Sequence, residues 1–196
     1  YREAICEVGR IVFQKGWVAA NDGNISIRLD QDRLLATPTG IWKGMMRPDD
    51  LIICDCQGNK IEGKRERTSE ILMHTTIYEM RPEIMSVVHN HSPSTIPFGI
   101  TNTKLKPLLH MCASIGHDVP LWNSHDKFGD TALLVNSMEM GRDLAKRLAL
   151  PAVIVARGSE RVFSGSHAGC WGAAACGAGA ERAKAAAAMT TNELTM

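Results

Sequence analysis

Two histidines separated by one residue, His89 and His91, form the most chemically suggestive pair in this chain. They follow a short apolar run, 84–88, with the composition of a buried β-strand. Residues i and i+2 of an extended backbone point to the same side, so both imidazoles can face one ion. We expect one divalent metal ion there, Zn²⁺ or Mn²⁺, with Fe²⁺ or Co²⁺ as further candidates. The alternative is a pair of hydrogen-bonded histidines near a turn.

The carboxylate of Glu70, near the start of the helix predicted before this strand, can reach the same ion. Ser69 is a good N-cap for a helix that we predict to run to about Arg81 and to stop at Pro82. Glu70 lies in its first turn, where the helix dipole alone would favour a negative charge. Its functional interpretation is metal ligand or general acid/base. His74, four residues later on the same helix face, is expected either beside this site or packed against the sheet.

Three short segments rich in hydroxyl and amide groups form a second constellation. If they converge, their side chains and backbone N–H groups can bind a phosphate or a carboxylate. Each segment alone is explained as a turn or a helix cap. The predicted substrate-binding residues are Asn24, Thr39, Gly40, Thr68 and Ser69.

The elements that must position these residues are helices around a largely antiparallel sheet in layers. Apolar residues recur at helical spacing over 2–15, 129–135 and 138–148, and a helix-like turn region covers 93–100. The expected strands are 25–28, 34–37, 51–54, 60–61, 84–90, 105–110, 152–156 and 162–163. We find no internal repeat and no interdomain linker, so one domain spanning 1–196 is expected.

Composition and charge narrow the function classes. Of the 196 residues 44% are apolar and 22% charged, which is ordinary for a soluble globular protein. A net charge of +1 favours neither nucleic acid nor an anionic membrane as partner. No apolar run approaches the roughly 20 residues that span a bilayer. The 6 cysteines contain no C-x-x-C pair and fit a reducing, cytoplasmic location. The chain begins at Tyr1 without an initiator Met, so we expect a trimmed product.

The composition changes abruptly from about residue 159. Residues 168–188 contain 11 Ala and 4 Gly among 21 positions, with Trp171 as the only large apolar side chain. A helix of this kind offers little apolar area to bury. We hypothesise that part of this tail comes from a shifted reading frame or a sequence-assignment error. Intact-mass and C-terminal peptide mass spectrometry test this, and peptides matching 157–184 would dismiss it.

Four motifs together resemble the class II aldolase/adducin superfamily, which includes fuculose- and ribulose-phosphate aldolases and epimerases. They are 21–26, 37–40, 69–70 and 89–91, and the resemblance runs from about 2 to 158. It implies a three-layer α/β/α fold of the α/β class with a mostly antiparallel central sheet. It also implies a homotetramer with active sites near subunit interfaces and a small-molecule phosphate or carboxylate substrate. The implied metal ligands are His89, His91 and Glu70, with Glu70 also the catalytic acid/base.

The resemblance departs from the aldolases in one segment. Sugar-phosphate aldolases have a Tyr just after a His where this chain has His110 and Met111. The stretches 96–101, 108–110 and 128–131 look more like the decarboxylase branch, which acts on hydroxylated aromatic or pyridine carboxylates. We therefore expect a metal-dependent carbon–carbon lyase, with decarboxylation ahead of aldol cleavage of a sugar phosphate. His110 is the candidate catalytic acid for reprotonation.

A second departure concerns the metal site. The family's third metal histidine should follow the strand 152–156, where this chain has Ser159. Glu160 can substitute as an oxygen ligand, or His167 can approach from the tail. The missing histidine gives weight to a non-enzymatic, adducin-like interaction module. The retained histidine pair and helix-opening glutamate favour an enzyme.

Overall fold

A single mixed sheet runs through the molecule. The computed structural model describes residues 1–101, 103–106, 108–110, 119–131 and 134–148, and the backbone of 152–156 and 160–165. In these ranges the strand order is β4-β3-β2-β1-β5-β8-β7-β6. All neighbours are antiparallel except the parallel pair β6 and β7. The strands are β1 (Asn24–Arg28), β2 (Arg33–Ala36), β3 (Ile52–Asp55), β4 (Lys60–Glu62), β5 (Ser86–Asn90), β6 (Leu121–Asn123), β7 (Ala152–Ala156) and β8 (Glu160–Gly165).

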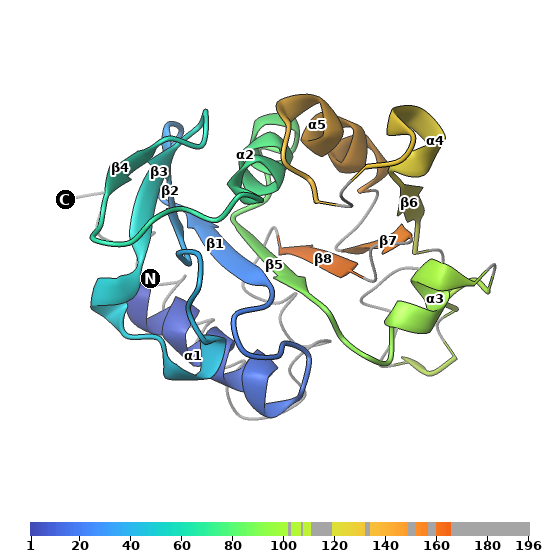
Figure 1. Cartoon of the computed structure of the whole chain (residues 1–196), viewed down its shortest axis with the longest axis horizontal. Helices are drawn as coiled ribbons and strands as arrows, with labels where there is room; N and C mark the ends of the chain where they lie inside the picture. The colour runs from blue at the N-terminus through green and yellow to red at the C-terminus, as the bar shows by residue number, and fades with distance from the viewer. Residues whose placement is uncertain are drawn as a thin grey trace.

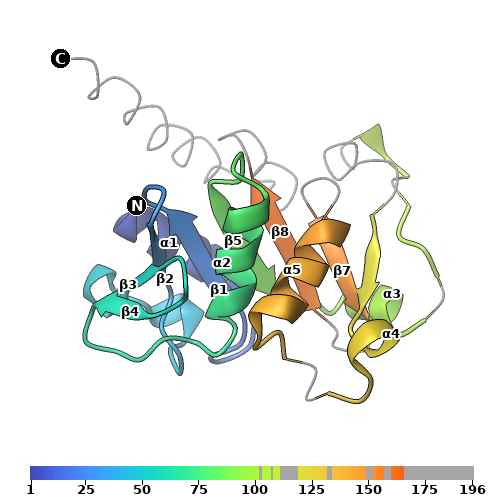
Figure 2. The same cartoon turned by 90° about the horizontal axis from the view of Figure 1, so that it is seen from above.

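Helices cover both faces of this sheet. Helix α1 lies on one face, and α2 and α5 lie side by side on the other (Figures 1 and 2). This arrangement confirms the three-layer α/β/α fold with a mostly antiparallel central sheet. The helices are α1 (Arg2–Gln14), α2 (Ile71–Met80), α3 (Ile96–Ile100), α4 (His125–Phe128) and α5 (Met138–Arg147), with 3₁₀ turns η1 (Lys43–Met45) and η2 (Pro48–Asp50). No helix in the described ranges is long and apolar enough to cross a membrane.

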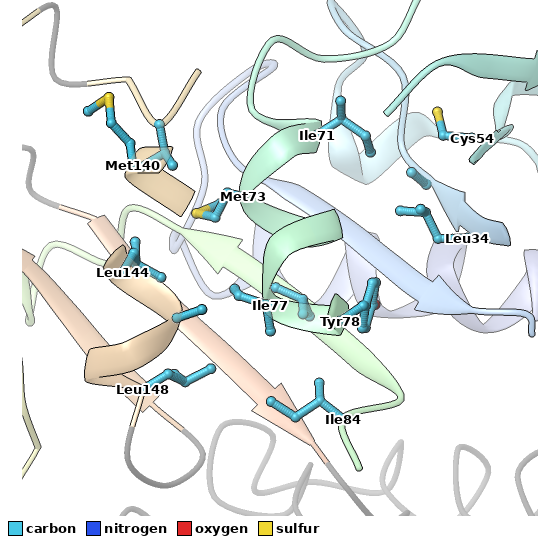
Figure 3. Close-up of a cluster of buried hydrophobic side chains, with 14 of the residues drawn as sticks. Leu34, Cys54, Ile71, Met73, Ile77, Tyr78, Ile84, Met140, Leu144 and Leu148 are labelled. Atoms are coloured by element: carbon cyan, nitrogen blue, oxygen red, sulfur yellow. The ribbon is translucent and has the colours of Figure 1, made fainter. Parts of the chain in front are cut away.

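The hydrophobic core is split by the sheet into two clusters. Val87 faces α2 and α5, where it joins Ile77 and Leu144 (Figure 3 shows this cluster). Val88 points to the opposite face and joins Ile5 of α1. Successive residues of a strand point to opposite faces, and both faces of β5 are covered, so all of its residues are buried. The central strand therefore carries its histidine at a fully enclosed position.

Three local expectations are wrong. Helix α2 begins one residue later than predicted, with Glu70 rather than Ser69 at its N-cap. Residues 105–106 and 108–110 form no strand. Residues 129–131 and 134–135 are not helical, although a helix was expected over 129–135; the helix α4 lies before them and ends where Gly129 adopts a positive φ of 67°.

Candidate active site

Strand pairing brings the first two polar residues of the site together. β1 and β5 run antiparallel in a register that places Asn24 opposite His89. Paired residues of neighbouring strands project to the same face, so both side chains lie on the side covered by α2. Gly23 makes this approach feasible, because a Cβ there would lie 2.5 Å from the carbonyl oxygen of His89. Gly23 also has a left-handed φ of 67°.

Glu70 completes a compact buried cluster with these two residues. The Asn24 Nδ2 group donates to Glu70 Oε2 at 3.0 Å. His89 Nδ1 lies 3.4 Å from the same carboxylate oxygen and 3.2 Å from Asn24 Oδ1. Exposed fractions are 7% for Glu70, 5% for Asn24 and 1% for His89. The predicted meeting of Glu70 with the histidine segment is therefore present in the structure.

His91 follows directly after β5 and lies beside His89. The two ring centroids are 5.0 Å apart, with 46° between the ring planes. The backbone N–H of His91 donates to the carbonyl of Trp17 at 2.9 Å, which holds the chain in place where the strand ends. The i, i+2 spacing thus brings both imidazoles to one place, as predicted.

The donor set fits a divalent cation. Glu70 Oε1 is buried and has no hydrogen-bond partner among the described residues. A buried carboxylate oxygen left in this way calls for a ligand, and imidazole nitrogens beside it are typical of a metal site. In the described ranges no three His, Cys, Asp or Glu side chains are close enough to hold an ion unaided.

The charges of the cluster follow from burial and hydrogen bonding. Burial alone would raise the pKa of Glu70, but His89 and Asn24 outweigh it and lower that pKa to about 2. Burial also lowers the pKa of His74 to about 3, with a smaller contribution from the charge of His89. At neutral pH Glu70 is thus a carboxylate and His74 a neutral imidazole.

A chain of buried polar groups continues behind the cluster. His74 Nε2 hydrogen-bonds to Asn24 Oδ1. Its other ring nitrogen, Nδ1, lies 2.7 Å from Ser26 Oγ, which lies 2.7 Å from Tyr78 OH. His74 therefore meets both expectations, since it packs against the sheet and contacts the site. Ser26 and Tyr78 were not predicted, although Ser26 lies two strand positions after Asn24 and Tyr78 four helix positions after His74.

The hydroxyl-rich loops lie next to one another at the N-terminus of α2. An isolated antiparallel bridge joins Pro38 to Arg67, and the backbone N–H of Thr39 donates to the backbone carbonyl of Glu66 at 3.0 Å. These bonds hold 39–40 beside 68–69. Thr39, Gly40 and Ser69 are exposed and Thr68 is half-buried, whereas Asn24 is buried within the cluster. Substrate binding by these residues stays a prediction.

Lys43 holds the two loops that precede the site, a role that the sequence did not reveal. Its side chain is 1% exposed, and its Nζ donates to the carbonyls of Asn21 and Ile41 at 3.1 Å each. Burial lowers its pKa to about 8, with Asp22 opposing the effect. Through these two hydrogen bonds, Lys43 links the turn before β1 to the loop that follows Gly40.

The remaining predicted residues lie away from the cluster or outside the described residues. His110 is exposed, and the described part of the chain shows no contact between it and Glu70 or His89. Ser159 and His167 lie outside the described residues, as does the tail from 166. Glu160 begins β8, whose backbone pairs Val162 with His89. That register places Glu160 beside the end of β5, where His91 follows.

The fold and the buried Glu70–His89 cluster define a class of protein that comparison with known families identifies. Residues 3–190 match the family model for the Class II Aldolase and Adducin N-terminal domain. The chain therefore belongs to the class II aldolase and adducin family, as its four motifs indicated.

Curated relatives that match part of the chain are methylthioribulose-1-phosphate dehydratases. A methylthioribulose-1-phosphate dehydratase from Methylococcus capsulatus is 41% identical over 91 residues, which are 46% of this chain and 44% of the relative. The enzyme of the same name from Pseudomonas syringae pv. tomato is 38% identical over 90 residues, again 46% of this chain and 44% of the relative. The chain thus matches less than half the length of these relatives.

Solved structures share the fold. YgbL from Escherichia coli, provisionally described as an aldolase/epimerase/decarboxylase, superposes with a TM-score of 0.69 at 26% identity, covering 84% of this chain and 78% of that one. L-fuculose-1-phosphate aldolase from Thermus thermophilus gives 0.69 at 22% identity, covering 83% and 78%. The second likeness shows the fold alone.

Proposed function

We propose that this protein is a metal-dependent lyase that removes water from a small ketose phosphate of the methylthioribulose-1-phosphate type. The observation that carries the proposal is the ionised Glu70 beside the His89–His91 pair, because its buried Oε1 has no hydrogen-bond partner among the described residues. The curated relatives carry the choice of substrate class. They favour the sugar-phosphate alternative over the decarboxylation that the sequence motifs indicated.

The chemistry needs a base, a binding site for the phosphate and stabilisation of negative charge. A bound divalent ion would polarise the substrate carbonyl and stabilise the enolate that forms when the neighbouring C–H bond breaks. His89, His91 and, in the resting protein, Glu70 would hold the ion. Glu70 Oε1 takes the proton, while Oε2 is held by Asn24 and His89. The hydroxyl on the next carbon would then leave, protonated to water, and the resulting enol would rearrange to a ketone.

The substrate phosphate would bind at the joined loops. Thr39, Gly40, Thr68 and Ser69 offer hydroxyl and backbone N–H groups at the N-terminus of α2, where the helix dipole favours an anion. His110, predicted as the acid for reprotonation after decarboxylation, is proposed here as the acid that protonates the leaving group. It is exposed, and in this proposal it would approach the substrate across a subunit interface of the homotetramer that the family resemblance implies.

Two residues are candidates for a further ligand beside His89, His91 and Glu70. Glu160 is the better candidate of the two that the sequence offers, because the backbone register of β8 places it beside the end of β5. His167 is the alternative. Zn²⁺ and Mn²⁺ are the proposed ions, and the cytoplasm remains the proposed location.

The experiment compares three reactions on the full chain after removal of metal and reloading with Zn²⁺ or Mn²⁺. Water loss from methylthioribulose 1-phosphate is expected, and it should disappear with a chelator. Aldehyde release from fuculose 1-phosphate and CO₂ release from hydroxyaromatic diacids should be much slower. A protein that only releases CO₂ would restore the decarboxylase hypothesis. A protein that binds no divalent ion would favour the adducin-like interaction module.

A further inference from the structure

Behind the proposed metal site lies a buried histidine to which the proposed reaction assigns no role. We propose that His74 is a positioning residue that fixes, through Asn24, which ring nitrogen of His89 faces the metal ion. The inference rests on the proposed metal-dependent function. It concerns a hydrogen-bond chain that runs from Tyr78 on α2, through Ser26 on β1, to the Glu70–His89 cluster.

The direction of each hydrogen bond follows from the one donor that is unambiguous. The Asn24 amide nitrogen donates to Glu70 Oε2 at 3.0 Å, so the amide oxygen is the end that faces the two histidines. An amide oxygen only accepts, and both His74 Nε2 and His89 Nδ1 are bonded to it. Both of those nitrogens must therefore carry a hydrogen.

Two consequences follow, one for each histidine. Metal binding needs His89 as a neutral imidazole with one N–H, and because that hydrogen is on Nδ1, its lone pair then lies on Nε2, the form in which it can bind a metal. The second acceptor near its Nδ1, Glu70 Oε2 at 3.4 Å, demands the same tautomer. His74 is left with its lone pair on Nδ1, which must accept the hydroxyl hydrogen of Ser26 at 2.7 Å.

The far end of the chain keeps this direction. Because the hydroxyl hydrogen of Ser26 goes to His74, its oxygen accepts from Tyr78 OH at 2.7 Å. All members are enclosed, with Ser26 0%, His74 1% and Tyr78 5% exposed. Water is thus excluded, and an orphaned member would leave a buried polar group unsatisfied. The chain therefore has one arrangement of hydrogens, which ends in a metal-competent His89.

Loss of His74 would release the Asn24 amide. With an apolar side chain at position 74, Asn24 Oδ1 loses one of its two donors, and only the bonds to His89 and to Glu70 Oε2 still oppose turning of the amide. A turned amide would present N–H groups to His89 Nδ1, which would then carry the lone pair. Its hydrogen would move to Nε2, the nitrogen that should bind the ion. Residues behind metal ligands typically change metal affinity in this way by roughly 10- to 100-fold.

The first test reads the tautomer directly in the full metal-free chain. Ring-¹⁵N-labelled histidine and long-range ¹H–¹⁵N spectra distinguish Nδ1–H from Nε2–H imidazoles, with assignment by His89→Gln and His74→Gln. We expect His89 as the Nδ1–H form and His74 as the Nε2–H form. Observation of His89 as the Nε2–H form in the wild type would overturn the proposal, whatever the protein's activity.

The second test measures Zn²⁺ affinity by competition with a chelator. His74→Leu should weaken binding roughly 10- to 100-fold, whereas His74→Gln, whose amide can still donate to Asn24, should stay within roughly threefold of the wild type. The matched control is Thr76→Val, which removes a buried hydroxyl of the same helix that bonds only to backbone carbonyls. Wild-type affinity in a folded His74→Leu variant would refute the positioning role.

A third variant keeps the proposal testable if His74→Leu does not fold. Ser26→Ala removes the hydrogen that His74 Nδ1 accepts, and it should weaken Zn²⁺ binding in the same direction. Tyr78→Phe, at the far end, should have a smaller effect because Ser26 can still donate. If the wild type binds no divalent ion, the proposed function fails, while the tautomer spectra still decide the inference about His74.

Discussion

Replacing Glu70 by glutamine should abolish most of the activity and leave the fold intact. Glutamine has the same shape, and its amide oxygen can accept from Asn24 Nδ2 and His89 Nδ1, as Oε2 does in the wild type at 3.0 and 3.4 Å. Its NH₂ group then takes the place of Oε1, where it cannot accept a proton. The variant therefore separates proton transfer from the hydrogen bonding that holds the cluster together.

The expected loss of activity follows from the role of a general base. Such groups contribute typically about 10²- to 10⁴-fold. The rate of dehydration should fall by that factor, which corresponds to about 3–5 kcal/mol in the activation free energy. Loss of a possible metal ligand adds to this only at subsaturating metal, so the assay is run at saturating Zn²⁺ or Mn²⁺.

The same variant should change how stability depends on acid. Burial raises the pKa of Glu70, but the bonds with His89 and Asn24 bring it below its ordinary value of 4.5, to about 2. A carboxyl group of this kind stabilises the fold above its unfolded pKa and loses that contribution as pH falls towards its folded pKa. At 1.36 kcal/mol per pH unit, about 3 kcal/mol of unfolding free energy should be lost across that interval.

Two measurements check both halves of the prediction. Initial rates with methylthioribulose 1-phosphate give kcat for wild type and variant. Urea unfolding of the metal-free proteins at a series of pH values gives the difference in unfolding free energy. The matched control is Glu79→Gln, an exposed carboxylate of the same helix that pairs with Arg142 at 3.0 Å.

The outcomes that would refute the reasoning are distinct. A Glu70→Gln variant that keeps a third of the wild-type kcat would show that Glu70 is not the base. A difference in unfolding free energy that does not change with pH would show that the carboxylate is not stabilised by its neighbours. The control should match the wild type in activity, and a loss there would point to a general effect of changing α2.

Three further perturbations test the surrounding architecture. His91→Ala should weaken Zn²⁺ binding by at least roughly 100-fold, beyond the range typical of residues behind ligands, and unchanged binding would exclude it as a ligand. His74→Gln should make the protein less sensitive to acid. Burial lowers the pKa of His74 from 6.5 to about 3, so between these pH values the unfolded wild-type chain binds a proton there that the folded one does not, and the fold loses stability. Urea unfolding across that interval should show a shallower decline for this variant, and an unchanged slope would contradict it. Arg28→Ala should destabilise the fold by about 2 kcal/mol, because the guanidinium donates to carbonyls at Ile84 and Tyr78; an unchanged thermal midpoint would contradict this.

Local pattern was enough to predict the parts of the site that depend on one element. The i, i+2 spacing of His89 and His91 depends only on an extended backbone, and the rings indeed lie side by side. Glu70 was found because a helix start has a sequence signature. The antiparallel strands of the first half were likewise visible as alternating segments between turn residues.

Features that depend on pairing between elements were not visible in the sequence. The register that places Asn24 opposite His89 is set by how β1 and β5 pack between two helical layers, over a separation of 65 residues. Nothing in the sequence indicated that this register directs the Asn24 amide to Glu70 and His89. Ser26 and Tyr78 look like an ordinary strand serine and core tyrosine until the fold brings them to His74.

The hydrogen bonding of Glu70 constrains how one carboxylate can serve two roles. Oε2 is engaged by Asn24 and His89, so Oε1 is the atom available both for a cation and for a proton. An oxygen that holds a divalent ion is a poor base, because the positive charge of the ion lowers the pKa of the carboxyl group. In the proposed function the two roles of Glu70 would therefore alternate, as a ligand of the ion in the resting protein and as the base when substrate is bound. In the proposed function the ion would then be held by its other ligands, and because two imidazoles alone make a weak site, the proposal includes Glu160 as a further candidate ligand.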